Sequence, residues 1–234
     1  MIHSALPESL AKARERLHQA LKEAGRPLNS ASLLAASKTK PAAVIRQAWQ
    51  LGQREFGENY LQEALEKQAD LADLDDIVWH FIGPLQSNKT RAVAERFDWI
   101  HSVDRLKIAK RLSEQRPAHL PPLNICLQVN ISREDSKSGV LPEETAALAA
   151  EVAKLPNVQL RGLMAIPAPA TTLEAQREPL AALRNLLVSL QAALPQAPLD
   201  TLSMGMSDDL EAAVFEGATL VRLGTAIFGA RNTD

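Results

Sequence analysis

Near the start of the chain, apolar residues recur at the spacing of one helix face. The stretch follows Pro7 and stops before Gly25, and both residues are typical of helix limits. Its apolar positions are Leu10, Ala13, Leu17, Ala20 and Leu21. The pattern predicts an amphipathic first helix that covers a core.

After this helix, short β-type runs alternate with longer helical patterns. Several of the short runs, such as NICLQVN, are apolar almost without interruption, which is typical of strands covered on both faces. Strands that alternate with helices pair in parallel. The strand candidates are residues 32–37, 55–57, 78–82, 99–103, 123–129, 159–165, 201–204 and 220–223.

The number of strand-helix units predicts the fold. Eight such units close most simply into an α/β fold of the (β/α)8 type, a single TIM barrel, here with an additional N-terminal helix. We expect one domain over residues 1–234. A doubly wound open sheet is the alternative, but no G-x-G-x-x-G pattern follows the first predicted strand.

Composition excludes several classes of partner. The chain has 26 Lys and Arg against 28 Asp and Glu, so it lacks the basic surface that binds nucleic acid through phosphates. No stretch is apolar for long enough to span a bilayer, and charges interrupt the N-terminal segment where a signal sequence would lie. Cys126 is the one cysteine, so no disulfide can form within the chain. We therefore expect a cytoplasmic protein without nucleic-acid or membrane partners.

The loops after the seventh and eighth predicted strands suggest an anion site. Barrels often bind phosphate with these loops, through backbone N–H groups and a helix N-terminus. Gly205 would let the backbone approach an anion, and Ser203 and Ser207 would donate hydroxyl groups. Gly224 and Thr225 repeat this chemistry after the eighth strand.

The helix that follows the seventh strand bears on the same site. Ser207 is predicted to be the N-cap of a helix that begins at Asp208. Asp208 and Asp209 would repel a phosphate, so we expect both carboxylates to face water. The alternative is that these are ordinary cap and turn residues.

Two lysines follow the first predicted strand, in LLAASKTKP. Leu34, Ala36 and Lys38 have the same strand phase, so Lys38 continues a row of side chains at the barrel mouth. Lys40 precedes Pro41 and has already left the strand. By itself Lys38 would be interpreted as a surface lysine. Opposite a phosphate loop, its amine suits an aldehyde cofactor that carries a phosphate, bound as a Schiff base at one end and as an anion at the other.

These residues lie in motifs that closely resemble the pyridoxal-phosphate homeostasis protein family, whose fold is that of the alanine racemase N-terminal barrel. The resemblance implies pyridoxal 5′-phosphate as the cofactor and a role in its intracellular homeostasis, without strong catalytic activity. PLP-dependent apoenzymes are the implied partners, and we expect a monomer. The motifs cover nearly the whole chain, in the order LLAASKTKP, REFGENYLQEA, WHFIGPLQSNKT, IHSVD, LQVNISREDSKSG, RGLMAI, LSMGMSDDLEAAV and VRLGTAIFGAR.

The resemblance also implies roles for single residues. Lys38 would form the Schiff base, Arg222 would face the pyridine nitrogen, and Asn59 and Met164 would line the ring. Because a guanidinium cannot accept a proton, the ring nitrogen would stay unprotonated and the ring would be a weaker electron sink. The residues implied around the phosphate are Ser203, Ser207, Gly224 and Thr225.

A PLP-dependent amino-acid racemase is the alternative function. Racemization needs a second base on the opposite face of the substrate. Racemases of the same barrel family take this base as a tyrosine from a C-terminal β-domain and a partner subunit. The sequence stops at Asp234, and its one tyrosine, Tyr60, begins a predicted helix, where we expect it to pack or to cap. These features favour a carrier.

Other candidate residues are predicted to be structural. His80 and His101 fall in the third and fourth predicted strands without a third ligand at matching strand ends, so we expect buried or hydrogen-bonded histidines and no metal site. Cys126 is predicted to pack in the core. Residues 133–139, REDSKSG, predict a solvated loop, and the alternative is a mobile lid that brings Lys137 to the cofactor.

Overall fold

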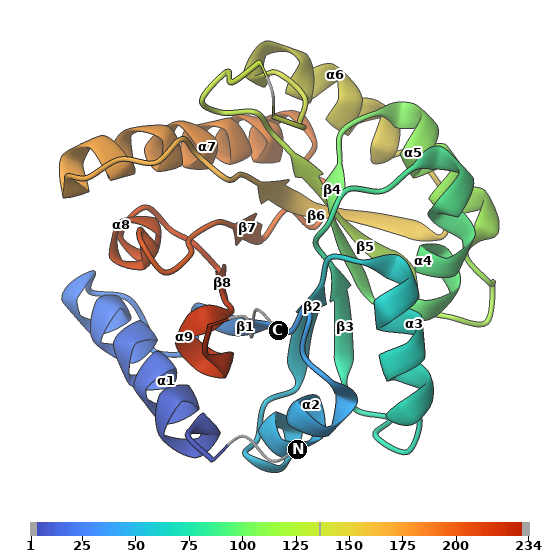
Figure 1. Cartoon of the computed structure of the whole chain (residues 1–234). Coiled ribbons are helices and arrows are strands. Elements are labelled where there is room, and N and C mark those ends of the chain that lie inside the picture. Colours follow the sequence, from blue (N-terminus) through green and yellow to red (C-terminus); the bar gives the residue numbers. More distant parts are fainter. Residues whose placement is uncertain (1–3, 136, 231–234) are drawn as a thin grey trace.

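The computed structural model describes residues 4–135 and 137–230, and its strands form one closed barrel (Figure 1). Every neighbouring pair of strands is parallel, and the strand order follows the chain. The predicted (β/α)8 barrel is therefore confirmed. The strands are β1 (Ser32–Ala36), β2 (Glu55–Glu58), β3 (Val78–Phe81), β4 (Trp99–Val103), β5 (Leu123–Gln128), β6 (Val158–Met164), β7 (Thr201–Ser203) and β8 (Leu220–Leu223).

The helices surround this barrel (Figure 1). Within the described residues, no helix combines the length and the apolarity needed to cross a membrane. The helices are α1 (Leu6–Glu23), α2 (Ala42–Gln50), α3 (Leu61–Asp70), α4 (Thr90–Arg96), α5 (Leu106–Gln115), α6 (Pro142–Val152), α7 (Leu173–Ala193), α8 (Leu210–Phe215) and α9 (Thr225–Phe228), with a 3-10 turn η1 (Ser87–Lys89).

The additional N-terminal helix α1 packs beside α8 and α9. All five apolar positions predicted for its inner face are buried, and Leu6 joins them. Ser9 Oγ donates a hydrogen bond to the carbonyl oxygen of Ile227 at 2.5 Å, which ties α1 to α9. The helix ends before Gly25, whose φ of 68° is typical of a residue that terminates a helix.

Buried side chains form two different layers. Between the strands and the helices lies an apolar cluster, to which β1 contributes Leu33 and Ala35. Leu34 is fully buried but outside this cluster, because successive side chains of a strand face opposite sides of the sheet. The barrel interior is unusually polar, since its buried residues include His80, His101, Ser203 and Arg222.

The predicted strand limits agree with the observed limits to within one residue at each end. The first strand ends at Ala36 rather than at Ser37. Ser37 instead opens a turn, in which its carbonyl oxygen accepts a hydrogen bond from Lys40 N at 3.1 Å. This turn places Lys38 at the edge of the barrel rather than within β1.

Candidate functional site

The barrel brings the predicted cofactor residues to one end. They lie in or directly after β1, β2, β6, β7 and β8, and parallel strands have their carboxyl ends at the same edge. The residues are Lys38, Asn59, Met164, Ser203, Ser207, Arg222, Gly224 and Thr225.

Lys38 lies in the turn after β1 and is half-buried. Its amine forms no hydrogen bond or ion pair with any residue in the described part of the chain. Lys40 differs, because its Nζ lies 3.4 Å from the carbonyl oxygens of both Gly229 and Ala230. Of the two lysines, Lys38 is the one whose amine is available to a ligand.

Arg222 lies inside the barrel and is 5% exposed. Its guanidinium donates to the carbonyl oxygens of Ala165 and Ser203, both at 3.1 Å, and to Ser203 Oγ at 2.6 Å. Burial lowers the pKa of Arg222 from 12.5 to about 10, and the charge of Asp209 acts in the opposite direction. The ends of β6 and β7 thus hold a buried cation in a fixed orientation.

A chain of hydrogen bonds connects Arg222 with Glu55 through the barrel interior. Beyond Ser203, whose Oγ lies 2.7 Å from His101 Nδ1, the chain continues from His101 Nε2 to His80 Nδ1 at 2.8 Å. It ends where His80 Nε2 lies 3.1 Å from Glu55 Oε1. The two histidines are buried and hydrogen-bonded, as the sequence predicted.

The chemistry of its two ends gives this chain a direction. A guanidinium can only donate and a carboxylate can only accept, so with neutral imidazoles one arrangement satisfies every group. Ser203 donates to His101 Nδ1, His101 Nε2–H donates to His80, and His80 Nε2–H donates to Glu55. Burial, followed by the charges of His80 and Arg222, lowers the pKa of His101 well below 6.5. His101 is therefore neutral at neutral pH.

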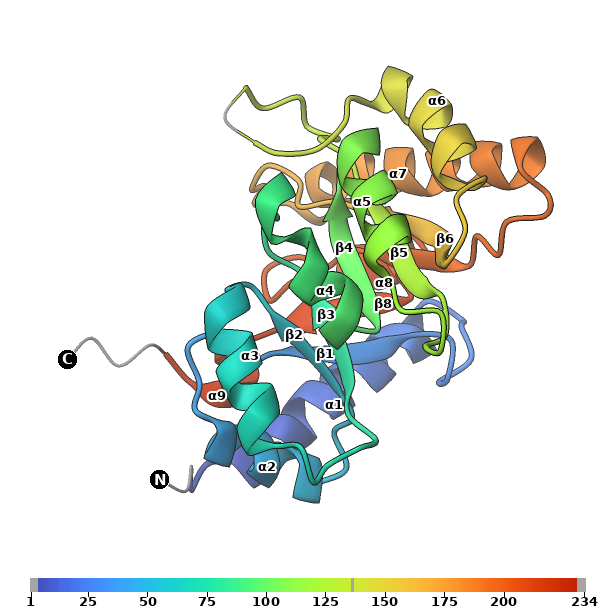
Figure 2. The same cartoon turned by 90° about the vertical axis from the view of Figure 1, so that its right-hand side faces the viewer.

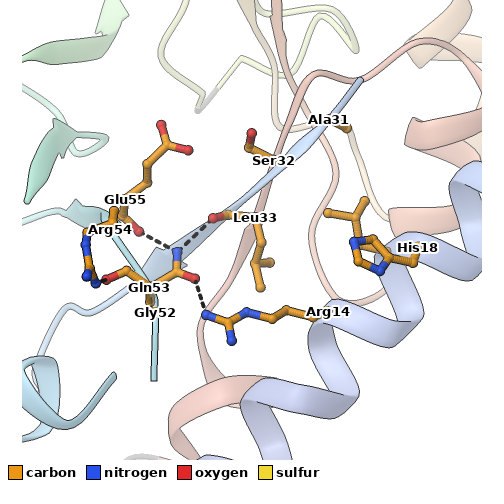
Figure 3. Close-up of a pocket in the computed structure, with 10 residues that line it drawn as sticks. Arg14, His18, Ala31, Ser32, Leu33, Gly52, Gln53, Arg54 and Glu55 are labelled. Carbon is orange, nitrogen blue, oxygen red and sulfur yellow. Dashed lines mark hydrogen bonds between the residues drawn. The ribbon is translucent and has the colours of Figure 1, made fainter. Parts of the chain in front are cut away.

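Glu55 lines a pocket of about 350 Å³ at the amino end of the barrel, opposite the predicted site (Figure 3). Gln53 connects β1 and β2 in the wall of the pocket, because its Nε2 donates to the carbonyl oxygens of Leu33 and Glu55, both at 2.8 Å. Arg14 Nη2 lies 3.5 Å from Gln53 Oε1 (Figure 3). The interior chain of hydrogen bonds therefore joins this pocket to the guanidinium at the other end.

A second pocket, of about 450 Å³, opens at the carboxyl end of the barrel beside β3, β4 and β5. Ser102, Asp104 and Gln128 are among the residues that line it, and none of the predicted cofactor residues does. Gln128 pairs with Met164 in the register of β5 and β6. This pocket adjoins the predicted site.

Asn59 carries an unsatisfied buried atom. Its Oδ1 has no hydrogen-bond partner among the described residues. Because a buried acceptor without a donor is costly, this is a position where a donor from a ligand would fit. Gly83 fixes the position of Asn59, since a Cβ added to Gly83 would lie 2.2 Å from the Asn59 carbonyl oxygen.

The loop after β7 differs from the prediction at Ser203 and Ser207. Ser203 is fully buried, and its hydroxyl is bonded to Arg222 and His101. Ser207 is not a helix N-cap, and that prediction is wrong. Helix α8 begins only at Leu210, because Asp209 Oδ1 first accepts a hydrogen bond from Met206 N at 2.8 Å and closes a turn.

The two aspartates of this loop have different surroundings. Asp208 is exposed, as predicted. Asp209 is partly buried, and its carboxylate accepts a hydrogen bond from Met206 N, so the prediction that it faces water is wrong. Gly205 has a φ of 100°, and a Cβ there would lie 2.7 Å from Ala213 Cβ, so the turn requires glycine.

The loop after β8 leads into the short helix α9. Gly224 lies directly before this helix and Thr225 is its first residue, which is exposed. Together with Ser207, they are the predicted anion ligands that the structure leaves accessible.

Tyr60 is the N-cap residue of α3, as expected, and its carbonyl oxygen accepts a hydrogen bond from Ala64 N at 2.9 Å. Its side chain makes no capping hydrogen bond and is 48% exposed, so it does not pack in the core.

The charged loop between β5 and α6 projects from the body of the molecule (Figure 2). Its base is held on both sides: Asn130 Oδ1 accepts from Glu134 N at 3.1 Å, and Asp104 Oδ2 accepts from Gly139 N at 3.1 Å. Lys137 lies 4.0 Å from Glu134. In this arrangement Lys137 is exposed, as the interpretation of a solvated loop predicts.

Cys126 is fully buried in β5, as predicted. Burial raises the pKa of its thiol to about 12, so it is not a nucleophile at neutral pH. Within residues 4–135 and 137–230, no group of three or more His, Cys, Asp or Glu side chains is placed to hold a metal ion.

A closed parallel barrel with an available lysine after β1 and a buried arginine on β8 defines a class of protein, the barrels of alanine racemase type. The family model described as alanine racemase, N-terminal domain, matches residues 9–232. An alanine racemase from Corynebacterium glutamicum has a TM-score of 0.71 over 96% of this chain and 62% of its own. At 19% identity, this likeness shows the fold alone.

Closer relatives define the family within this class. A pyridoxal phosphate homeostasis protein from Pseudomonas aeruginosa is 62% identical over 229 residues, which cover 98% of this chain and 97% of that protein. PipY from Synechococcus elongatus, solved without and with PLP bound, is 42% identical, with TM-scores of 0.86 and 0.84 over 96% of this chain and 100% of PipY. This chain belongs to the family of pyridoxal phosphate homeostasis proteins.

Proposed function

We propose that this protein binds pyridoxal 5′-phosphate through Lys38 and acts in intracellular homeostasis of that cofactor, carrying or buffering it without strong catalytic activity. The observation that carries the proposal is the unengaged amine of Lys38 at the same barrel end as the buried guanidinium of Arg222. The ligand is supported by PipY, whose structure has been solved with PLP bound.

The residues at the carboxyl end fit this cofactor. When bound, it supplies an aldehyde that condenses reversibly with a primary amine, with loss of water. Lys38 provides the amine, and Asn59 Oδ1 provides an acceptor that is buried and unpaired within the described chain. Met164, buried at the end of β6, provides an apolar surface for the ring. Ser207, Gly224 and Thr225 lie in the loops proposed to hold the phosphate.

Arg222 determines how far the site can promote chemistry. Its guanidinium has only hydrogen-bond donors, so it could not accept a hydrogen bond from a protonated ring nitrogen. Beside Arg222 the nitrogen would therefore stay unprotonated, and the bound ring would be a weaker electron sink. Ser203 joins the proposed site through Arg222, because its hydroxyl accepts one of the guanidinium N–H groups.

An amino-acid racemase is the second candidate, favoured by the alanine racemase fold and by the exposure of Tyr60 next to Asn59. The two functions differ in proton transfer at the substrate Cα. We expect the protein loaded with PLP to produce little D-alanine and little deuterium at Cα when it is incubated with L-alanine in deuterated water. Sustained racemization that is lost in Lys38→Ala would establish the racemase instead.

The proposal extends to the setting of the protein. Because attachment to an amine is reversible, PLP-dependent apoenzymes are the proposed recipients of the cofactor. A cytoplasmic location, a monomeric state and a single domain over residues 1–234 remain predictions, of which the location rests on a chain with one buried cysteine.

A further inference from the structure

Three charged side chains form a cluster beside the turn that carries Lys38, with Glu58 and Lys67 buried and Glu63 partly exposed at its rim. Lys67 of α3 is 5% exposed, and its Nζ lies 2.8 Å from Glu58 Oε1 and 2.7 Å from Glu63 Oε1. Glu58 is fully buried at the end of β2. The predicted cofactor residues include none of the three.

This cluster holds the two peptide groups on either side of Lys38. Before Lys38, the Ser37 carbonyl oxygen accepts a hydrogen bond from Lys67 Nζ at 2.8 Å. After Lys38, Thr39 N donates to Glu63 Oε1 at 2.5 Å. The backbone of Lys38 is thereby fixed at both of its dihedral angles.

Glu58 fixes the side chain that precedes Lys38. Ser37 Oγ donates to Glu58 Oε2 at 2.6 Å, and Glu58 Oε1 accepts a hydrogen bond from Lys67 Nζ. Ser37 N also donates to the Gly57 carbonyl oxygen at 2.9 Å. Every polar group of Ser37 therefore bonds to a residue of β2 or α3. Its carbonyl oxygen also accepts the turn hydrogen bond from Lys40 N.

Thr39 shows that the turn needs such support. Its φ is 67°, in the left-handed region that β-branched residues rarely adopt. A backbone of this kind persists only where its surroundings enforce it. Two hydrogen bonds do so: Lys40 N donates to the Ser37 carbonyl oxygen and closes the turn, and Thr39 N donates to Glu63.

The cluster is a poor device for stability alone. Burial raises the pKa of Glu58, against the opposing effect of Lys67, which reflects the cost of placing the carboxylate away from water. Buried ion pairs are often no more stabilising than apolar side chains of similar volume, whereas they do specify one geometry. A function in placing Lys38 accounts for this cost.

We infer that Glu58, Glu63 and Lys67 are positioning residues for Lys38. They fix the turn around Lys38, so that the amine of Lys38, and not the amine of Lys40, is directed to the ligand. The inference rests on the proposed attachment of the cofactor to Lys38. It adds a second layer of residues, from β2 and α3, to the site.

The test uses Glu63→Ala, because Glu63 lies at the rim of the cluster and its loss leaves the barrel core intact. Glu66→Ala, which removes an exposed carboxylate from the same helix, is the matched control. Glu63→Gln keeps an oxygen that can accept from Thr39 N, and is the rescue variant.

The first measurement needs no cofactor. Amide hydrogen exchange at Thr39, followed by NMR, should accelerate about tenfold or more in Glu63→Ala. This factor corresponds to the loss of one charge-assisted hydrogen bond. Exchange should be unchanged in Glu66→Ala. Unchanged exchange in Glu63→Ala would overturn the inference, whatever the protein binds.

The second measurement follows the cofactor. With added PLP, the visible absorption should appear about tenfold more slowly in Glu63→Ala than in the wild type, since the same hydrogen bond is lost. Borohydride should then label Lys40 in addition to Lys38, and Glu63→Gln should move both readouts back toward the wild type. Faster exchange at Thr39 with unchanged attachment would assign the cluster a structural role and overturn the inference. Label absent from Lys38 in the wild type would instead refute the proposed attachment.

A double variant separates positioning from stability. Glu58→Gln with Lys67→Met removes both buried charges at similar volume, and we expect the midpoint of thermal unfolding to stay close to that of the wild type. Attachment of PLP should still be slowed about tenfold. A variant that unfolds earlier but attaches PLP at the wild-type rate would contradict a positioning role.

Discussion

At the scale of single residues, Ser203 and Ser207 have different surroundings although the sequence gives them the same predicted role. Ser203 is buried and bonded to Arg222 and His101, whereas Ser207 is half-buried with no bond from its hydroxyl within the described residues. We expect Ser207→Ala to weaken PLP much more than unphosphorylated pyridoxal, by about 1.5–3 kcal/mol for one hydrogen bond to a charged group. Ser203→Ala should weaken both ligands similarly, because it releases Arg222. Titrations of the two ligands decide, and a phosphate-specific loss in Ser203→Ala would contradict this assignment.

His101 should make stability depend on pH. Its pKa in the folded protein is well below 6.5, mainly because it is buried. As the pH falls below about 6.5, the unfolded chain therefore binds one proton more than the folded chain. The stability that His101 contributes above this pH is then lost, at about 1.4 kcal/mol per pH unit. Between pH 6 and pH 5, the free energy of unfolding should fall less steeply in His101→Gln than in the wild type.

Urea unfolding at each pH measures this slope. His119→Gln, which removes an exposed histidine, serves as the control. Equal slopes in the wild type and His101→Gln would show that His101 is protonated in the folded state.

Residue-scale chemistry could be predicted from sequence only in part. The strand phase of Leu34 led to the choice of Lys38 over Lys40, but β1 ends at Ala36 and Lys38 lies in the following turn, so attachment at Lys38 stays a prediction. The charged cluster was not predictable, because Glu63 and Lys67 have the spacing of any exposed helical ion pair. The burial of Lys67 depends on how α3 packs against the turn after β1.

At the scale of elements, the segment after β3 approaches the end of β2 closely, at Gly83 and Asn59. A Cβ on Gly83 would meet three backbone atoms of Asn59, the nearest at 2.2 Å, so Gly83→Ala must displace this residue. We expect weaker PLP binding by about tenfold, the equivalent of one hydrogen bond, together with reduced stability. Binding by absorbance and thermal unfolding measure the two effects.

Gly25→Ala is the comparison for this prediction. Gly25 has open space around its Cα but a φ of 68°, so alanine there should lower stability by about 1 kcal/mol without affecting PLP. If Gly83→Ala loses stability but binds PLP as the wild type does, then the segment after β3 does not position Asn59 for the cofactor.

The limits of most elements could be predicted because most strands are apolar runs bounded by turn residues. The start of α8 could not. Ser207 and Asp209 are both good N-cap residues, and the choice depends on the turn that Asp209 makes with Met206. Local sequence leaves this competition open.

At the scale of the whole molecule, the barrel separates apolar and polar burial. The apolar layer between strands and helices follows from the sequence, since several strands are apolar almost without interruption. The polar interior does not follow from it. His80, His101 and Ser203 come from three strands, and their contact across the barrel depends on the register between strands that are far apart in the chain.

The central claim, that the barrel holds PLP on Lys38, is tested most directly by locating the attached cofactor. Protein loaded with PLP is reduced with borohydride, and the modified residue is identified by peptide mapping, with Lys38→Ala measured in parallel. We predict label on Lys38 in the wild type, and no visible absorption band in Lys38→Ala, whose circular dichroism should match the wild type because Lys38 lies at the rim of the barrel. Label on Lys40, or an undiminished band in Lys38→Ala, would contradict the account.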